Sequence, residues 1–275
     1  MKVVLFCGGA GMRLRGYSED VPKPMVTIGA RPVLWHVMKY YAHFGHKNFI
    51  LCLGYKANAI KNYFLEYEES VSNDFIFADG GRNLQFMQRD IDDWKITFVD
   101  TGLRSTIADR LRMIEPHLDG DDMFLANYSD GLTDFHLPDM IDEFSCRDSY
   151  ASFLSVQPHS SSLDTVHLDE EGCVREIKSM KDANIWINGG FFILRKDVFR
   201  YIQPGEELVY APFLRMIREG RVWSQKYSGF WQCMDTFRDK QLLDELEASG
   251  HAPWCLWKNG KDIKNGSPSL QVVAC

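Results

Sequence analysis

A glycine-rich segment with two separated cations follows the first apolar run of the chain. From Leu5 to Met25 the sequence is LFCGGAGMRLRGYSEDVPKPM. Its clustered glycines leave backbone N–H groups free to point at an anion. Arg13 and Lys23 add positive charge that matches phosphate oxygens, and the prolines on both sides of Lys23 hold it in a stiff, extended segment. These residue types favour phosphate binding over a purely structural turn.

The spacing of this segment differs from the two common phosphate-binding fingerprints. A P-loop requires Gly-x-x-x-x-Gly-Lys-Ser/Thr, which the chain does not contain. A dinucleotide-binding loop requires Gly-x-Gly-x-x-Gly, and here Leu14 occupies the position of the third glycine. A nicotinamide dehydrogenase is therefore disfavoured.

Two aspartates are candidates for the other half of a phosphate site. Asp130 follows an apolar run, and Asp235 lies in the last third of the chain. Ser-Asp-Gly is common turn chemistry, so the residues alone leave a structural role for Asp130 as the default. The eight histidines have no recurring spacing, and a structural role is the simpler interpretation of His36 in an expected helix.

Composition limits the classes of function. The chain has 275 residues, 45% of them hydrophobic, which is enough for one sizeable core or two closely packed subdomains. A net charge of −7 argues against nucleic-acid binding through phosphate neutralisation, and no apolar run is long enough to span a membrane. Seven scattered cysteines without metal-binding spacing predict reduced thiols in a cytoplasmic protein, most of them buried.

Alternating strands and helices are expected in the first half of the chain. Its expected strands are Lys2–Phe6, Phe49–Leu53, Ile96–Val99 and Met123–Asn127, and its expected helices are Pro32–Ala42, Asn58–Tyr67 with Asn58 as the cap, and Thr106–Ile114. The second half adds expected strands at Ala151–Val156, Val166–Leu168, Val174–Ile177 and Phe191–Leu194, and helices at Ala211–Arg218 and Asp239–Ala248. The pattern predicts an α/β fold with a Rossmann-like, open, mostly parallel twisted sheet flanked by helices, with ligands at the carboxyl ends of the strands. A small antiparallel portion is expected around residues 160–181.

Further motifs occur in order along nearly the whole chain. They are Gly54-Tyr55-Lys56, Val99-Asp100-Thr101-Gly102, Asp130-Gly131, Asn188-Gly189-Gly190-Phe191, Gly229-Phe230-Trp231-Gln232-x-Met234-Asp235-Thr236 and Ala252-Pro253-Trp254. Together with GGAGMRL and Pro22-Lys23-Pro24-Met25, they resemble the sugar-phosphate nucleotidyltransferases, and in particular the glucose-1-phosphate cytidylyltransferase branch. The block from Gly229 to Thr236 is the most specific of these signals.

The resemblance implies a division of labour within one compact domain. Residues 1–150 would form the nucleotide-binding half, residues 151–257 the acceptor-binding half, and residues 258–275 a polar tail. The implied nucleotide-binding residues are Gly8, Gly9, Gly11, Met12, Arg13, Lys23, Arg110 and Ser129, with Arg13 and Lys23 also catalytic; Asp130 and Asp235 would hold Mg²⁺, and Thr165, Lys178, Asn188, Gly189 and Trp231 would bind the acceptor.

The implied reaction transfers CMP from CTP to a phosphorylated acceptor such as a sugar 1-phosphate and releases pyrophosphate. The nucleophile is a phosphate oxygen whose second pKa is about 6, so no general base is required near neutral pH. UTP, dTTP or GTP remain alternatives to CTP, and a catalytically silent, nucleotide-binding regulatory protein remains an alternative to an enzyme. Relatives assemble into homo-oligomers, which implies the same here.

Three departures from the family pattern fall in the acceptor half. The usual Glu-Lys-Pro segment is replaced by residues 177–181, where Lys178 and Lys181 are both candidates for the missing lysine. Thr165 stands where the family has a glycine, and Ala211 stands where a glutamate normally contacts the sugar hydroxyls. Because a site built to bind hydroxyls rejects poorly matched ligands strongly, these changes raise the hypothesis of an acceptor other than plain glucose 1-phosphate.

Overall fold

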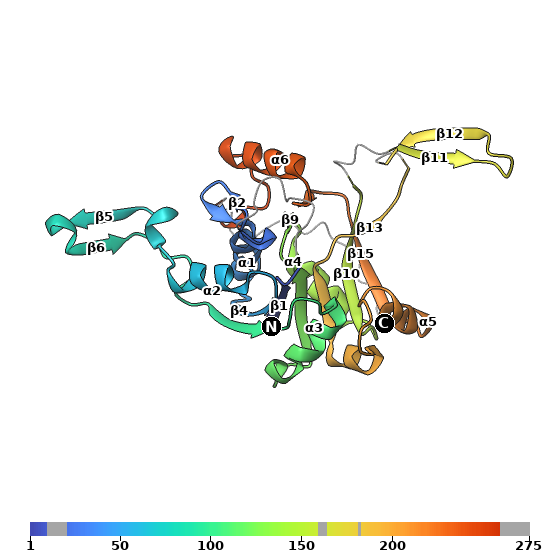
Figure 1. Ribbon diagram of the computed structural model, residues 1–275, viewed down its shortest axis with the longest axis horizontal. Coiled ribbons are helices and arrows are strands. Elements are labelled where there is room, and N and C mark those ends of the chain that lie inside the picture. The colour runs from blue at the N-terminus through green and yellow to red at the C-terminus, as the bar shows by residue number, and fades with distance from the viewer. Residues whose placement is uncertain (10–20, 159–163, 181–182, 259–275) are drawn as a thin grey trace.

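The computed structural model describes residues 1–9, 21–158, 164–180 and 183–258. A central mixed sheet of eight strands carries helices on both faces (Figure 1). Its strands are β1 (Lys2–Phe6), β4 (Asn48–Leu53), β7 (Lys95–Asp100), β8 (Met123–Tyr128), β10 (Ala151–Val156), β13 (Ile187–Asn188), β14 (Phe192–Arg195) and β15 (Val222–Tyr227). The expected Rossmann-like fold is confirmed.

Strand order explains how the two halves of the chain join. The order is β13-β10-β14-β8-β1-β4-β7, and β15 pairs with β10. The pairs β1–β4, β1–β8, β4–β7 and β10–β15 are parallel, whereas β14 runs antiparallel to both β8 and β10. The β8–β14 pair therefore joins the amino-terminal part of the sheet to the carboxy-terminal part without a break.

The sheet separates two apolar cores, as expected for strands that are buried on both faces. The helices are α1 (Val33–His43), α2 (Ala57–Leu65), α3 (Ile107–Ile114), α4 (Leu137–Ser145), α5 (Ala211–Arg218) and α6 (Phe237–Ala248). Val3 and Leu5 of β1 pack on the face covered by α1, α2, α4 and α6, whereas Val4 and Phe6 pack on the face covered by α3 and α5. No helix among the described residues is long and apolar enough to cross a membrane.

Several local predictions need correction. Helix α2 begins after Lys56, which has a left-handed backbone with φ of 49°, so Asn58 lies inside the helix and is not its cap. Helix α3 does begin after Thr106, whose side chain accepts from Asp109 N in a capping box. The burial expected for the cysteines is confirmed for Cys7, Cys52 and Cys255, whereas Cys146 and Cys173 are exposed and Cys233 is partly buried.

Two antiparallel ribbons extend from the body at opposite ends of the molecule (Figure 1). One is formed by β11 (Asp164–Leu168) and β12 (Val174–Ser179), which confirms the expected antiparallel portion. The other, formed by β5 (Phe75–Ala78) and β6 (Asn83–Phe86), was not predicted. Two shorter ribbons pair β2 (Thr27–Ile28) with β3 (Arg31–Pro32) and β9 (Gly131–Thr133) with β16 (Trp231–Cys233).

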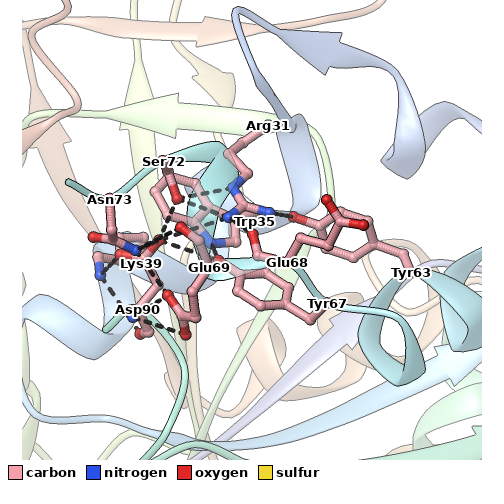
Figure 2. A network of polar contacts seen from close by, with 10 residues as sticks. All are labelled: Arg31, Trp35, Lys39, Tyr63, Tyr67, Glu68, Glu69, Ser72, Asn73 and Asp90. Atoms are coloured by element: carbon pink, nitrogen blue, oxygen red, sulfur yellow. Dashed lines mark hydrogen bonds and ion pairs between the residues drawn. The ribbon is translucent and has the colours of Figure 1, made fainter. Parts of the chain in front are cut away.

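A buried polar network anchors the base of the β5–β6 ribbon to α1 (Figure 2). The Arg31 guanidinium donates to Glu68 O at 2.7 Å and stacks 4.2 Å from the Tyr67 ring centroid. On the other side of the ribbon, the Asp90 carboxylate accepts from Lys39 Nζ at 2.7 Å and from Tyr67 Oη at 3.1 Å. Arg31 of β3 and Lys39 of α1 therefore fix the two ends of the ribbon segment to one continuous stretch of the chain.

His36 is a structural residue, as predicted. Its Nε2 lies 3.1 Å from Ile28 O, and its Nδ1 accepts from Trp254 Nε1 at 3.2 Å, so the imidazole is the neutral form that donates through Nε2. Burial lowers the pKa of His36 from 6.5 to about 4.

Acidification is therefore expected to destabilise the protein through His36. His36 takes up a proton near pH 6.5 in the unfolded chain but only near pH 4 in the folded protein. The contribution of neutral His36 to the stability of the folded state is therefore complete above pH 6.5 and is lost as the pH falls to 4. The loss is about 3 kcal/mol. Urea unfolding at several pH values should show a steeper loss of stability in the wild type than in His36→Gln. Parallel curves for the two proteins would contradict this role.

Candidate active site

A cavity of about 280 Å³ lies at the carboxyl ends of β1 and β8, where an open α/β sheet is expected to bind its ligand. Of the predicted glycines and cations, it contains Gly8, Gly9, Lys23 and Arg110. Its lining residues are Phe6, Gly8, Gly9, Lys23, Pro24, Ser105, Ile107, Arg110, Tyr128, Ser129, Asp130 and Glu207. Gly11, Met12 and Arg13 lie outside the described residues.

The Lys23 ammonium lies between two carboxylates. Its Nζ is 2.5 Å from Asp235 Oδ1 and makes an ion pair with Asp130 Oδ2. The Lys23 side chain is only 14% exposed. Burial alone would lower the pKa of Lys23, but the charges and hydrogen bonds of the two aspartates outweigh burial and raise that pKa above its ordinary value.

Local structure fixes all three charged groups. Lys23 begins a short 3₁₀ helix (Lys23–Met25) that places Pro24 in its first turn and is closed by Met25 N donating to Pro22 O at 2.8 Å. Asp130 and Asp235 are 105 positions apart in sequence, but Asp130 precedes β9 and Asp235 follows its antiparallel partner β16, so both lie at the same end of the ribbon. Met234 N also donates to Asp130 O at 3.0 Å. The long-range strand pairing is what brings the carboxylates together.

The Arg110 guanidinium forms the floor of the cavity. It donates to Gly8 O at 3.3 Å, to Leu53 O at 3.1 Å and to Thr101 Oγ1 at 2.6 Å, at the ends of three neighbouring strands. A Cβ at Gly8 would lie 2.0 Å from Arg110 Nη1, so the guanidinium fits only beneath a glycine. The predicted nucleotide contact of Arg110 stays a prediction, since its observed partners are the protein's own strands.

Ser129 supports the same wall. Its hydroxyl donates to Phe6 O at 3.0 Å, which ties the segment after β8 to the end of β1. With Gly8 and Gly9, it belongs to the cavity as the sequence predicted.

Three of the predicted acceptor residues lie together beside the cavity. Trp231 Nε1 donates to Gly189 O at 2.9 Å, and Asn188 Nδ2 is 3.5 Å from the hydroxyl of Tyr128, which lines the cavity. A Cβ at Gly189 would lie 3.1 Å from Trp231 Nε1, a tight contact that the indole would have to relieve by moving a few tenths of an ångström. Their role in acceptor binding stays a prediction.

Thr165 and Lys178 are not brought to the cavity. They pair with each other on the β11–β12 ribbon, where Thr165 Oγ1 donates to Lys178 O at 3.1 Å. Lys178 Nζ makes an ion pair with Glu176 at 2.7 Å, and the ribbon projects from the body (Figure 1). In this arrangement neither residue lines the cavity.

The two aspartates suit a magnesium ion by their chemistry. Both reach one positively charged atom, Lys23 Nζ, so a small cation can contact both. The described residues contain no cluster of three or more His, Cys, Asp or Glu side chains that could enclose a metal. Mg²⁺ prefers such a sparse set, because it keeps waters and phosphate oxygens as its other ligands.

Six lining residues were not among the predicted site residues: Phe6, Pro24, Ser105, Ile107, Tyr128 and Glu207. Tyr128 directly follows the predicted strand Met123–Asn127, so the rule that ligands bind at strand ends had the information to include it. Ser105 and Ile107 flank Thr106, the cap of α3. Glu207 lies in a loop with no motif, and no sequence signal indicated it.

Fold and site together define an open-sheet α/β protein with a cavity lined by glycines and a carboxylate–lysine–carboxylate cluster that includes the lining residues Lys23 and Asp130. The model of the family described as "Nucleotidyl transferase" matches residues 2–219. The chain belongs to the nucleotidyl transferase family, and its activity is that of a nucleotidyltransferase.

Individual relatives agree with this assignment. The glucose-1-phosphate cytidylyltransferase of Salmonella typhi is 35% identical over 262 residues, covering 94% of this chain and 100% of that protein. The D-glycero-alpha-D-manno-heptose 1-phosphate guanylyltransferase of Campylobacter jejuni is 27% identical and covers 78% of this chain and 85% of its own. The structure of a UDP-glucose pyrophosphorylase, at 13% identity, has a TM-score of 0.65 and covers 90% of this chain and 98% of that one, which supports the fold. The resemblance to the cytidylyltransferase branch is confirmed.

Proposed function

We propose that this nucleotidyltransferase transfers CMP from CTP to a phosphorylated acceptor such as a sugar 1-phosphate and releases pyrophosphate. The observation that carries the proposal is the Lys23 ammonium between Asp130 and Asp235, in a cavity that Gly8 and Gly9 also line. The choice of CTP is supported by the 35% identity to a glucose-1-phosphate cytidylyltransferase.

In the proposed reaction, an oxygen of the acceptor phosphate attacks the α-phosphorus of CTP. A bond forms between them, the bond from the α-phosphorus to the bridging oxygen breaks, and pyrophosphate leaves with that electron pair. Lys23, together with Arg13, holds the phosphate chain in line for this displacement. The backbone N–H groups of the glycine segment and the walls of the cavity keep the nucleotide oriented.

Asp130 and Asp235 would hold Mg²⁺, which would offset the negative charge of the triphosphate and of the departing pyrophosphate. The Lys23 ammonium would then exchange its two carboxylate partners for phosphate oxygens, which it binds equally well as a donor.

The acceptor is proposed to differ from plain glucose 1-phosphate. The support is the loss of the Glu-Lys-Pro triplet, Thr165 in place of glycine and Ala211 in place of glutamate. A modified sugar phosphate or another phosphorylated small molecule fits this change. Pyrophosphate release should be measured with CTP and a panel of phosphorylated acceptors, and efficient use of glucose 1-phosphate alone would reject this part of the proposal.

The same assay separates the remaining alternatives. UTP, dTTP and GTP should each be slower than CTP, and the guanylyltransferase relative makes GTP the necessary comparison. Tight binding of a triphosphate with no turnover on any acceptor would favour the catalytically silent regulatory protein. The free thiols agree with the predicted cytoplasmic location, which stays a prediction.

Homo-oligomeric assembly is supported by the two ribbons. Phe77 and Leu84 form a cross-strand pair on β5–β6, and Val166 and Ile177 form one on β11–β12. Each of these four side chains is between 48% and 65% exposed. An isolated two-stranded ribbon is marginally stable in water, so contact with another copy of the chain would stabilise both ribbons.

Replacing Phe77 with aspartate is expected to reduce the assembled mass. Sedimentation should show the wild type above its 31.7 kDa monomer mass and Phe77→Asp shifted toward it. The matched control is Gln85→Asp, whose residue lies on the other face of the same ribbon. A monomeric wild type, or an equal shift in the control, would contradict the assembly.

A further inference from the structure

Two adjacent glutamates before α5 have different surroundings. The Glu206 carboxylate makes an ion pair with Arg215 and accepts from Gln203 N at 3.0 Å, so it is used within the protein. Glu207 instead belongs to the lining of the active-site cavity. Within the described part of the chain, no hydrogen bond or ion pair of the Glu207 side chain is found.

The segment that carries Glu207 is held in place. Gly205 N donates to Asp109 Oδ1 at 2.9 Å, which fastens the loop to the start of α3. Leu208 is fully buried in the core beneath α5, and Tyr210 N donates to Glu207 O at 3.2 Å. Glu207 therefore lines the cavity from a loop that is fixed on both of its sides.

The charge of Glu207 acts on the neighbouring walls of the cavity. Burial is the main reason that the pKa of Tyr128 is raised to about 12, and the negative charge of Glu207 adds to that effect. The same charge also acts on the guanidinium of Arg110. Glu207 is thus electrostatically coupled to two residues of the proposed nucleotide pocket.

An ionised carboxylate only accepts hydrogen bonds, and it repels phosphate. Asp130 and Asp235 can face the phosphates because Lys23, and in the proposed reaction Mg²⁺, offsets their charge. No such cation pairs with Glu207 among the described residues, so its carboxylate suits the uncharged part of the ligand. The nucleoside of CTP has uncharged hydrogen-bond donors in two places, the ribose hydroxyls and the 4-amino group of cytosine. A carboxylate that accepts from such an amino group also repels the carbonyl oxygen of uracil at the same position.

We propose that Glu207 is a specificity-determining residue that accepts a hydrogen bond from the nucleoside of the substrate. This inference rests on the proposed function. The acceptor-side residues Asn188, Gly189 and Trp231 do not line the cavity with Glu207, whereas the glycines and Arg110 do, so the carboxylate is assigned to the nucleotide.

The test is calorimetric binding of CTP, dCTP and UTP in the presence of MgCl₂, without acceptor, to the wild type, Glu207→Ala and Glu207→Gln. If Glu207 binds the ribose, Glu207→Ala should lose about tenfold or more in CTP affinity and the CTP-to-dCTP ratio should approach one. If it binds the base, the CTP-to-UTP ratio should fall instead, most strongly in Glu207→Gln, because the amide can donate to the uracil carbonyl.

Glu206→Gln is the matched control, because it loosens the same loop without touching the cavity. Ratios within twofold of the wild type in both Glu207 variants would overturn the inference, as would an equal change in Glu206→Gln. If the wild type binds CTP but the affinity ratios of the Glu207 variants equal those of the wild type, only this inference is rejected. A wild type that binds none of the triphosphates rejects the proposed function and the inference with it.

Discussion

The Asp235→Asn variant is expected to lower kcat by about 10² to 10³, the usual effect of losing one preorganised group that stabilises charge. Among the described residues, Asp130 and Asp235 are the two carboxylates paired with the Lys23 ammonium, so an amide at Asp235 removes half of the proposed magnesium site. The loss should appear in kcat and in the magnesium concentration needed for half-maximal rate, more than in the KM for CTP.

Asp142→Asn is a suitable control for this variant. Asp142 is an exposed carboxylate on α4, so its removal changes the net charge by the same amount without touching the cavity. Pyrophosphate release over a magnesium titration is the measurement. A kcat for Asp235→Asn within threefold of the control would contradict the role given to this carboxylate.

The second large effect is expected at the cations. Lys23→Met should lower kcat by about 10² to 10³, since the phosphate chain loses a positioned charge. The same variant leaves Asp130 and Asp235 without their common partner, so it should bind Mn²⁺ more tightly than the wild type in the absence of nucleotide. Metal binding and turnover should therefore change in opposite directions.

Arg13→Ala provides the companion measurement. The role predicted for Arg13 from the sequence implies that this variant lowers turnover by roughly 10² to 10³. Electron paramagnetic resonance of Mn²⁺ measures the metal affinity of both variants, and an increase is expected for Lys23→Met because Lys23 contacts both carboxylates. Near-normal turnover in either variant, or unchanged Mn²⁺ affinity in Lys23→Met, would count against the assigned roles.

The sequence predicted the positions of strands and helices best where a local residue pattern specifies them. Buried parallel strands such as β1 and β4 are continuous apolar runs, and helix α3 has a cap that is visible in the sequence, so their positions were predicted closely. The β5–β6 ribbon was missed because its apolar residues are largely exposed and its strands are only four residues long. Such short segments are not distinguished from loops by periodicity.

The site was predictable only in part. Residues alone indicated the glycines and Lys23, but the meeting of Asp130 with Asp235 depends on the β9–β16 pairing, which no local pattern specifies. Family resemblance supplied that pair. Glu207 was accessible to neither approach, because its position depends on a loop tied to α3 by a single hydrogen bond from Gly205.

The contacts of Arg110 have a thermodynamic consequence for ligand affinity. One guanidinium connects Gly8, Leu53 and Thr101, so the cavity floor is as rigid as the strands that it joins. A ligand that binds there has little conformational entropy to remove from the backbone. The free energy of its contacts with the floor then appears almost entirely as affinity, because the floor is already in the conformation that binding requires.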